Sequence, residues 1–562
     1  MIYVNHVGFL PWSAKHCVIV NPPEIEFAVS NDLWGPNIVH RGILRRVSAE
    51  LGDAWVGDFS AVRDDGTYEV FCGAMKSRPF SVHKEIYDQP LRTLFNYYPT
   101  QRCGDSLTGW NAPCHLQDAR RADTGQHMDL AGGWHQSCDL RKWITGSPYG
   151  LLGLAQLGLL RDPRWDRGQI ADELRWGNRF FHRMIRPDGG LMDHVVFPVT
   201  WGERQVYTND PPTCASYMMI AGQLLCARYL KERDPEHSRA CLDAALRIWA
   251  YMTGPDCPKT PYKPSVLPPG HGWLAGCFHA HYPGSAMERG DALYAAIRLS
   301  EATGDAKYLD RACECAEDLV KLQVGGDIET NPAAACFRIG PDNSGLIAFG
   351  FFTTFGTVFG AMGLAELAML RPEHAGAPKW RQAVRLIAEQ KCRMAERNPW
   401  GLIPSYWHSD NPGAGRPGGS GRYRYFYRFR SSNGDEIRVG PNGDIAGSAL
   451  FLVRAHRLLG DPRYMAAAQR QADWILGCNP FDASTVEGVG VNQPLRYMNG
   501  GEFFPPTPQI PGGVMTGIMG DEDDNPEPFG NNCSTEYDIP AGAPLMWLLS
   551  EMASAELNRT AS

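Results

Sequence analysis

The segment 132–143, GGWHQSCDLRKW, places one carboxylate, Asp139, among a histidine, a glutamine and a cysteine. Two interpretations compete for it. In one, the segment is a surface turn held to the domain beneath by Trp134 and Trp143. In the other, it is a loop that presents Asp139 as a general base, and His135 fixes the loop from below. The rest of the chain has to decide between them.

A second set of reactive side chains surrounds the same segment. With sixteen cysteines and sixteen histidines in the chain, an isolated Cys–His pair says little. Cys103, Cys114, His115 and His135, however, form a set of two cysteines and two histidines, which suits tetrahedral Zn²⁺ and leaves no position for substrate. Such a structural ion would tie the helix end at Cys103 to the loop that carries Asp139. The alternative is two buried cysteines and two ordinary histidines.

The composition excludes several classes of partner. A net charge of −8 leaves no basic footprint for nucleic acid. No apolar run approaches the roughly 20 residues of a membrane span, and the first residues lack the basic and apolar stretches of a secretory signal. The cysteines follow no framework spacing, which favours reduced and buried thiols. We therefore expect a cytoplasmic protein, with a trimmed secreted form as the alternative.

The first 84 residues indicate a small β domain. Seven short alternating or β-branched runs are separated by turn segments such as NPP, NDLWGPN and RDDG. Seven strands in this space predict an antiparallel sandwich of the immunoglobulin type over 1–84. The predicted strands are IYVNHVGFL, HCVIV, IEFAVS, GILRRV, AWVGDF, TYEVFC and PFSVH. No cluster of potential catalytic groups falls among them.

From about residue 88 the apolar residues recur with a helical period. Short links alternate with long connections, and long connections in compact domains are usually functional. In a ring of antiparallel helices every second connection lies on the same face, so this alternation predicts an all-α (α/α)6 barrel with the long loops on one rim. The predicted helices are 88–103, 148–161, 169–185, 214–232, 236–253, 287–303, 306–323, 352–371, 378–397, 440–459, 461–477 and 537–557. The predicted long loops are 104–147, 186–213, 254–286, 324–351, 398–439 and 478–536.

Several ordered motifs resemble those of glycoside hydrolase family 9. VNHVGFLP resembles the opening of the family's N-terminal immunoglobulin-like domain, and YYPTQRCG, PCHLQDA and DLAGGWHQSCDLRKW follow in the family's order. WILGCNPFDASTVEGVG, PGGVMTG and TEYDIPAGAPL resemble its closing motifs. The resemblance runs nearly the full length. It implies an (α/α)6-barrel domain over 85–562 that hydrolyses β-glycosidic bonds with inversion.

The resemblance also assigns roles to two carboxylates. Inverting hydrolysis needs a general acid and, roughly 6.5–9.5 Å away, a general base that activates water. By the family's pattern Glu536 is the acid and Asp139 is the base. Gln136 departs from the pattern, because the family usually has an aspartate there, and an amide accepts a hydrogen bond from water without taking its proton. The four Cys and His residues match positions that hold zinc in some members.

The segments expected to contact substrate depart further from the family. The family usually has a His-His-Arg sequence after its GxNPxxxSxVxGxG motif, whereas GVGVNQPLRYMNG leaves only Arg496 here. The arginine-rich stretch 416–430 would suit a carboxylated sugar, or it forms a solvated hairpin. Indoles in loops offer flat platforms to sugar rings. The substrate-binding candidates are Trp134, Trp273, Tyr406, Trp407 and Arg496. CFHAH, with Cys277, His279 and His281, is interpreted as a sugar contact or as plain structure.

Three functional hypotheses follow from these motifs. The first is an inverting β-glycosidase of the β-glucan or cello-oligosaccharide type that trims imported fragments. The second is a hydrolase of a modified or acidic β-glycan. The third is a catalytically silent carbohydrate-binding homologue. An oligosaccharide is the expected partner and Zn²⁺ the expected structural metal, while Ca²⁺, which is known in the family, is assigned no site.

Overall fold

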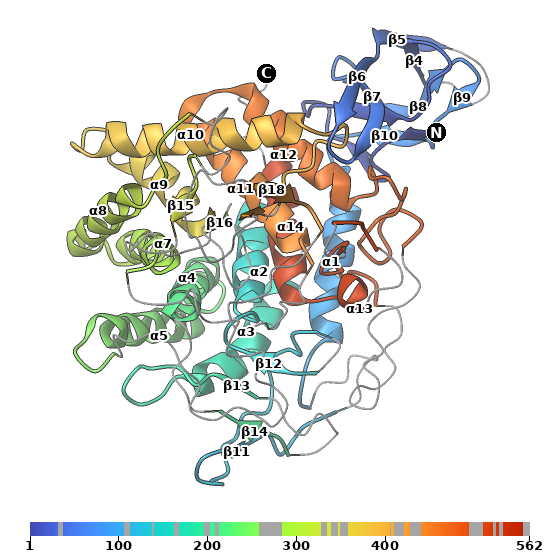
Figure 1. Cartoon of the computed structure of the whole chain (residues 1–562). Helices are drawn as coiled ribbons and strands as arrows, with labels where there is room; N and C mark the ends of the chain where they lie inside the picture. The colour runs from blue at the N-terminus through green and yellow to red at the C-terminus, as the bar shows by residue number, and fades with distance from the viewer. Residues whose placement is uncertain are drawn as a thin grey trace.

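The chain folds into a small β domain followed by a large helical domain (Figure 1). The computed structural model describes residues 1–31, 37–105, 113–137, 140–161, 168–195, 203–207, 213–257, 284–327, 334–338, 347–348, 358–404, 406–409, 421–426, 440–493, 510–520, 524–527 and 532–554. The last strand of the β domain ends at Val82 and the first helix begins at Asp88. The division into two domains at residue 84 stays a prediction.

The N-terminal domain is a sandwich of two sheets. One sheet has the strand order β1-β3-β7-β6, and the other has the order β2-β10-β8-β4-β5, with β9 paired to β8. Phe9 meets Phe59 and Phe80 edge to face, with ring centroids 5.5 Å apart in both pairs, in the core between the sheets. The strands are β1 (Ile2–Tyr3), β2 (Gly8–Phe9), β3 (His16–Ile19), β4 (Glu26–Ser30), β5 (Ile38–Ile43), β6 (Arg45–Ala49), β7 (Gly52–Asp58), β8 (Gly66–Cys72), β9 (Met75–Lys76) and β10 (Phe80–Val82).

The predicted sandwich is confirmed, but two predicted strands each divide between the sheets. IYVNHVGFL forms β1 in one sheet and β2 in the other. GILRRV spans the end of β5 and the start of β6, and buried Leu44 lies between them where the chain crosses over. Crossing between sheets is a tertiary event, and the alternation of residue types is the same on both sides of it.

The helical domain is an (α/α)6 barrel, as predicted. Within the described residues, inner helices pack in the closed order α2, α4, α7, α9, α11, α14 and back to α2. The inner helices are α2 (Tyr149–Leu160), α4 (Thr213–Leu230), α7 (Ala286–Thr303), α9 (Val358–Leu370), α11 (Asn442–Leu459) and α14 (Ile539–Met552). Small residues allow their close approach, because a Cβ on Gly290 of α7 would lie 2.7 Å from the Cα of Gly360 on α9.

Outer helices cover this ring, and each of them except α1, the first helix of the chain, is joined to the inner helix before it by a short link. The outer helices are α1 (Asp88–Thr100), α3 (Gln169–Phe181), α5 (Pro235–Thr253), α8 (Ala306–Lys321), α10 (Ala377–Glu396) and α12 (Pro462–Ile475). Several of the short links end in a capping aspartate, such as Asp234 before α5 and Asp461 before α12. The long connections precede the inner helices and therefore lie on one rim.

The long connections carry small sheets that the sequence did not predict. One sheet has the order β11-β14-β13-β12 and the other the order β15-β16-β17-β18. The strands are β11 (Arg120–Arg121), β12 (Lys142–Trp143), β13 (His194–Val195), β14 (Gln205–Val206), β15 (Phe337–Arg338), β16 (Ile347–Ala348), β17 (Tyr406–Ser409) and β18 (Gly421–Arg424). Strands of two to four residues are too short to show an alternating pattern.

The end of the barrel opposite the rim is closed by buried charges. Glu366 of α9 pairs with Arg298 of α7, and also with Arg454 of α11 at 3.1 Å. Arg454 pairs in turn with Glu551 of α14 at 2.5 Å. Four inner helices are thereby joined by ion pairs whose members are each 12% exposed or less. Charges this buried persist only when paired.

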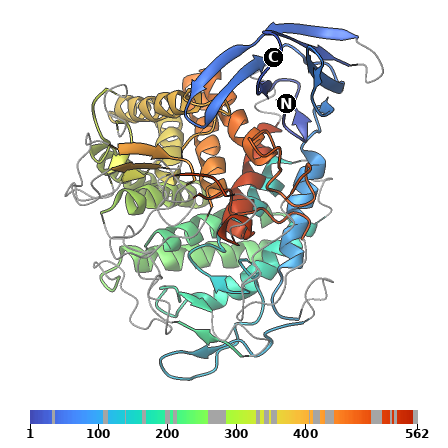
Figure 2. The same cartoon turned by 45° about the vertical axis from the view of Figure 1, so that its right-hand side comes forward.

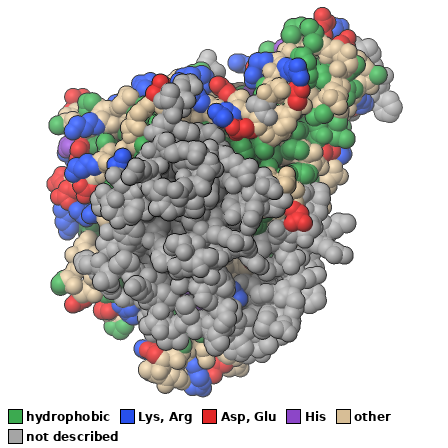
Figure 3. Space-filling view, in the orientation of Figure 1, with side chains coloured by type: hydrophobic (Ala, Val, Ile, Leu, Met, Phe, Trp, Pro, Cys, Tyr) green, Lys and Arg blue, Asp and Glu red, His purple; other side chains and the backbone are tan. Residues whose placement is uncertain are grey.

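The N-terminal domain packs against the helical domain near α12 through polar and aromatic contacts (Figure 2). The Nδ2 of Asn5 donates to Oδ1 of Asp473 on α12 at 2.8 Å. The Tyr3 ring packs edge-on against Trp400 at 5.1 Å. Hydrophobic side chains gather where the two domains meet (Figure 3). Glu50 accepts a hydrogen bond from the Tyr425 hydroxyl at 2.6 Å, so the β domain also contacts the connection that carries β17 and β18.

Asp473 makes this contact sensitive to pH. Burial raises the pKa of this carboxyl to about 6, although Gln469 and Asn5 donate hydrogen bonds to its Oδ1. The folded state therefore holds a proton that the unfolded state releases near pH 4, and stability falls as the pH rises from about 4 to 6, by about 3 kcal/mol. Asp473→Asn should remove this part of the pH dependence. Urea unfolding at pH 4.5 and at pH 7 measures the free energy of unfolding of wild type and variant. If this free energy changed by the same amount between the two pH values in both proteins, the assignment would be contradicted.

Two further observations bear on the class of protein. The cysteines whose side chains the structure describes are buried and form no disulfide with one another, in line with the expectation of reduced thiols. In the described part of the chain, no helix is both long enough and apolar enough to cross a bilayer.

Candidate functional site

The two polar segments predicted to carry the catalytic carboxylates lie side by side on the rim. Ser137 and Asp538 form an antiparallel backbone bridge. The backbone N–H of Ile539 donates to the carbonyl of Gln136 at 3.0 Å. Asp538 also caps α14, because its side chain accepts from Ala541 N–H at 2.8 Å. The start of the last inner helix is therefore bonded directly to the loop that precedes α2.

Asp139 and Cys138 lie outside the described residues, but Ser137 and Leu140, which flank this pair, are fixed. The N–H of Leu140 donates to the carbonyl of Ser137 at 3.3 Å. Leu140 has a φ of 59°, an uncommon conformation for a residue with a side chain. The Arg204 guanidinium donates to the Leu140 carbonyl. The backbone that flanks Asp139 is thus held by the turn between Ser137 and Leu140 and by the buried Arg204.

Glu536 lies on the other side of the bridge. Its carbonyl accepts from Thr516 N–H at 2.6 Å, which fixes the backbone. Its neighbours Thr535 and Tyr537 are buried, whereas Glu536 itself is partly exposed. Glu536 is therefore held in place by buried neighbours and is still accessible to solvent, as a residue that contacts substrate must be.

Gln136 is held beside these two positions. Its Oε1 accepts a hydrogen bond from Ser147 Oγ at 3.4 Å, and its side chain is partly exposed. A Cβ on Gly146 would lie 2.3 Å from the same oxygen, so glycine is required there for the amide to keep its place. The segment 132–143 is called the base loop here, after the predicted general base Asp139. The Gln136 amide can therefore orient a water molecule near the base loop, although it cannot accept the proton of that water.

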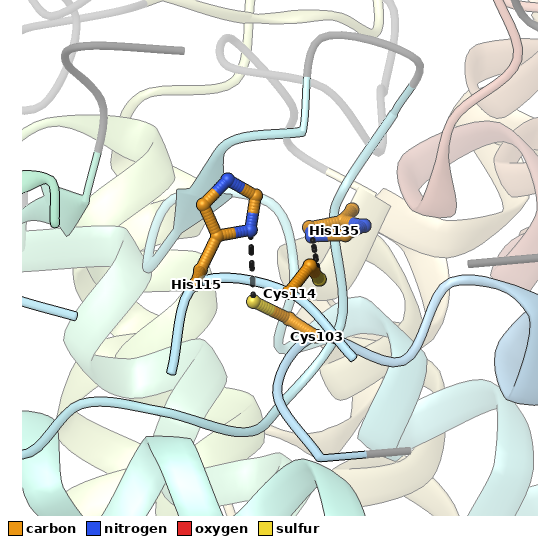
Figure 4. Close-up of side chains that lie close together, drawn as sticks. All are labelled: Cys103, Cys114, His115 and His135. Carbon is orange, nitrogen blue, oxygen red and sulfur yellow. Dashed lines mark hydrogen bonds between the residues drawn. The ribbon is translucent and has the colours of Figure 1, made fainter. Parts of the chain in front are cut away.

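The four predicted metal ligands converge in one buried cluster below this loop (Figure 4). Cys103 Sγ lies 3.7 Å from His115 Nδ1, and Cys114 Sγ lies 3.6 Å from His135 Nε2. Each of the four side chains is 3% exposed or less. The distances leave room for a central ion bound by two sulfurs and two nitrogens, as in structural zinc sites. The chain therefore brings together a metal-capable cluster at the predicted residues.

The electrostatics of the cluster also suit a cation. Burial acts against ionisation, but the hydrogen bond from Cys114 and the positive charge of Lys142 hold the pKa of Cys103 well below its ordinary value. The same hydrogen bond and burial raise the pKa of Cys114. Burial lowers the pKa of His135, so its ring is neutral at pH 7. A thiolate and a neutral imidazole are the forms in which cysteine and histidine bind a metal ion.

A buried ion-pair cluster joins these ligands to the base loop. Arg204 donates to Asp118 Oδ2 at 2.6 Å and to Cys103 Sγ at 3.5 Å, in addition to the Leu140 carbonyl. Lys142 also pairs with Asp118 at 3.1 Å, and all three charged side chains are fully buried. Sequence reasoning missed Arg204, because nothing in the stretch WGERQV distinguishes it from a surface arginine.

Arg204→Met should lower the free energy of unfolding by about 3–5 kcal/mol, since it leaves the buried Asp118 with a single cation. Arg120→Met is the matched control, because Arg120 pairs with Glu203 at 2.6 Å while 53% exposed. That variant should cost under about 1 kcal/mol. Urea titrations of both variants make the comparison, and similar losses would show that Arg204 is not the anchor.

The structure corrects one predicted substrate contact. Trp134 is fully buried, its indole N–H donates to Glu173 at 2.6 Å, and its ring packs on Tyr98 at 5.3 Å. The indole has no face open to a sugar, so Trp134 packs the loop onto α3 instead of binding substrate. Trp143 is also buried and stacks on His194 at 4.4 Å. Both indoles therefore hold the loop to the domain beneath, as the first interpretation of this segment expects, and the role of Asp139 as a base stays a prediction.

The other candidates for substrate contact are less fully described. Tyr406 and Trp407 lie on β17, whose register pairs Tyr406 with Arg424 and Trp407 with Tyr423 of β18. These two strands form a hairpin, but the arginine side chains of the stretch 416–430 lie outside the described residues, so both interpretations of that stretch stay predictions. Trp273 and Arg496 also fall outside the described residues, as do Cys277, His279 and His281.

Comparison with known proteins gives one consistent family. The family model described as Glycosyl hydrolase family 9 matches residues 87–391. The chain is 23% identical over 529 residues to a cellodextrinase of Butyrivibrio fibrisolvens, covering 87% of this chain and 85% of that protein. A metagenome-derived glycoside hydrolase family 9 endoglucanase has a similar fold, with a TM-score of 0.69 and 21% identity over 99% of both chains. A Zn-binding triple mutant of the family 9 endoglucanase J30 gives a TM-score of 0.69 and 21% identity, over 97% of this chain and 99% of that one.

The matched residues make up more than half of the chain and include α1 to α9 together with the base loop. The barrel, the N-terminal sandwich and the order of the motifs all agree with this match. The chain therefore belongs to glycosyl hydrolase family 9 and is a glycoside hydrolase.

Proposed function

We propose that this glycoside hydrolase cleaves β-1,4 bonds of cello-oligosaccharides with inversion, with Glu536 as general acid and Asp139 as general base. The observation that supports this assignment is the backbone bridge between Ser137 and Asp538, which brings the two polar segments together. The β-glucan substrate rests on the names of the relatives, a cellodextrinase and endoglucanases.

In this mechanism the two carboxyl groups act on opposite faces of the sugar ring. Glu536 donates a proton to the leaving glycosidic oxygen, and Asp139 takes a proton from the water that attacks the anomeric carbon. The water needs space, so the two carboxyl groups should lie roughly 6.5–9.5 Å apart. Gln136 would orient the water by accepting one of its hydrogen bonds. Asp139 is then the only base.

We further propose that Cys103, Cys114, His115 and His135 hold Zn²⁺. When bound there, the ion supplies a rigid cross-link, because four protein ligands leave no open position for catalysis. Arg204 connects the ligand Cys103 to the Leu140 carbonyl beside Asp139. The cluster would therefore act on hydrolysis only by fixing the position of the base.

Digestion of a panel of oligosaccharides tests the proposed function. Neutral cello-oligosaccharides, their carboxylated counterparts and xylo-oligosaccharides are incubated with the protein, and the first product is followed by proton NMR. The expected result is cleavage of the neutral β-1,4 glucans with initial release of the α-anomer. Release of the β-anomer would contradict inversion. Binding without cleavage would favour the silent homologue, and preference for the carboxylated substrate would favour the acidic-glycan hydrolase.

Gln136→Asp should move the acid limb of the pH–activity profile to higher pH by about one unit. A second carboxylate beside Asp139 disfavours its ionisation and raises its pKa. A base with a raised pKa becomes active only at higher pH. The profile of kcat/KM against pH measures the shift, and Gln136→Asn, which adds no charge, is the control. An unshifted acid limb in Gln136→Asp would mean that the residue does not adjoin the base.

A further inference from the structure

A second set of potential metal ligands lies on the outer wall of the barrel, apart from the cluster below the base loop. His182 begins the 3-10 turn η1 (His182–Met184) that follows α3, and His237 and Cys241 lie on α5. One ligand atom from each of the three residues lies within 4.8 Å of the others. The proposed hydrolysis uses none of these residues, so the set needs an explanation of its own.

The local structure presents these side chains in fixed positions. His237 and Cys241 are four residues apart, which puts both on one face of α5. Asp234 caps α5 by accepting from the N–H of His237 at 3.1 Å, and it also pairs with Arg175 of α3 at 2.9 Å. The start of α5 is thereby tied to α3, the helix that leads into His182. The three ligands are thus held by elements already locked together.

The lone pairs of His237 and Cys241 point toward one place. The Nδ2 of Asn178 donates to His237 Nε2 at 3.1 Å and to Cys241 Sγ at 3.3 Å. Its amide is oriented by Gln223, whose Nε2 donates to Asn178 Oδ1 at 2.7 Å. In the structure an amide nitrogen therefore occupies a position that a nitrogen and a sulfur both face. An ion that entered here would take over these two lone pairs from Asn178.

His182 is oriented from the other side. With its amide fixed by Asn178, Gln223 presents Oε1 to His182 Nε2 at 3.0 Å, so this nitrogen carries the proton. The lone pair of His182 is then on Nδ1. A histidine that donates one ring N–H to an amide or carboxylate oxygen, and binds a metal through the other nitrogen, is the usual arrangement in metal sites.

Burial acts on the three ligands in two ways. It raises the pKa of the Cys241 thiol to about 12, so an ion has to displace the thiol proton when it binds. Cys241 and Asn178 are almost fully buried, whereas both histidines are partly exposed and give an ion a way in from solvent. The histidine rings stack at 5.5 Å with an interplanar angle of 19°. Burial lowers the pKa of both histidines, which keeps them in the neutral form that binds metal.

We propose that His182, His237 and Cys241 form a second metal site that binds Zn²⁺, with the Asn178 amide displaced from between His237 and Cys241. Two imidazoles and a thiolate suit Zn²⁺ and not the hard cations Mg²⁺ and Ca²⁺. Binding releases the Cys241 thiol proton to solvent, and a water molecule or the Asn178 carbonyl oxygen completes four-fold coordination. The ion would pin the start of α5 to the end of α3.

Metal-stripped full-length protein is titrated with Zn²⁺ against a chromophoric chelator. Wild type should bind two equivalents, and His237→Gln and Cys241→Ser should each bind one. Cys315→Ser is the control, because that thiol is equally buried on α8 and no histidine among the described residues contacts it. Cys114→Ser should lose the other equivalent. The two sites are therefore scored independently, and failure of one does not imply failure of the other.

Asn178→Asp provides a gain-of-affinity test that does not depend on removing a ligand. A carboxylate at this position adds negative charge beside the ion, so the Kd of the second equivalent should fall on the order of tenfold. Mg²⁺ and Ca²⁺ should not compete. The proposal is overturned if wild type binds no equivalent that Cys241→Ser removes, or if Asn178→Asp leaves Zn²⁺ binding unchanged. The three residues would then be held by hydrogen bonds alone.

Discussion

Asp139→Asn should lower kcat on a cello-oligosaccharide by about 10²- to 10⁴-fold, because it removes the proposed general base and preserves the shape of the side chain. The absence of a second carboxylate at Gln136 makes the loss hard to compensate. KM should change little, since asparagine can still accept a hydrogen bond from water. Initial rates over a range of substrate concentrations separate the two parameters.

Asp129→Asn is the matched control for this variant. Asp129 belongs to the same connection, but it is 63% exposed, and its ion-pair partner among the described residues is Arg183 at the surface, at 2.9 Å. Its replacement should leave kcat within about twofold, as surface ion pairs contribute little. If Asp139→Asn kept wild-type kcat, the base would be another carboxylate on the rim, and the loop would serve as a scaffold only.

Glu536→Gln extends the same test to the proposed acid. A general acid matters in proportion to how poor the leaving group is. The loss should therefore be large on a cello-oligosaccharide and small on an aryl β-glycoside with an activated leaving group. Equal losses on the two substrates would point to a role for Glu536 in binding or folding instead of proton donation.

Cys114→Ser should remove about one equivalent of Zn²⁺ and lower the stability of the protein substantially. A ligand that binds only the folded state contributes about 4 kcal/mol when its concentration is 1,000 times its Kd, and metal binding here would be coupled to local folding. Elemental analysis and thermal unfolding of the purified variant measure the two effects. Activity should fall as well, because Cys103 and Arg204 connect the cluster to the base loop.

Cys392→Ser supplies the comparison for this variant. Cys392 on α10 is also buried, and its thiol donates to the Arg463 carbonyl at 3.8 Å. It should keep the metal content of wild type and lose little stability. A metal-free wild-type protein that unfolds at the same temperature as the loaded form would contradict a structural ion.

The sequence predicted the helical barrel well, for a physical reason. Outer helices such as α8 have one apolar face and begin after a capping aspartate, here Asp305. The sequence therefore shows both the helical spacing of their apolar residues and the position where each helix begins. Inner helices such as α9 are buried on nearly all faces, and their length and lack of charge identify them instead. The crossing between sheets at Leu44 was not predictable, because it depends on which sheet each side of the chain pairs with.

The sequence predicted which segments form the site better than it predicted the burial and contacts of individual side chains there. The family resemblance implied that the segments of Gln136 and Glu536 contribute to one site, and the backbone bridge between Ser137 and Asp538 agrees with this. The burial of Trp134 could not be foreseen, since a tryptophan after two glycines is equally compatible with a sugar platform and with a core anchor. Arg204 has partners 64 to 101 positions away, and no local pattern encodes contacts at that range.

The bridge between Ser137 and Asp538 sets an order of assembly during synthesis. Residue 538 follows residue 137 by roughly 400 positions, so at about 5–20 residues per second it emerges about 20–80 s later. The four ligands of the cluster below the loop all lie between residues 103 and 135, and closing so short a span costs little entropy. All four predicted ligands are therefore synthesised while the segment that carries Glu536 and Asp538 is still untranslated. A nascent chain stalled before the last helix could capture its ion and still lack the proposed acid.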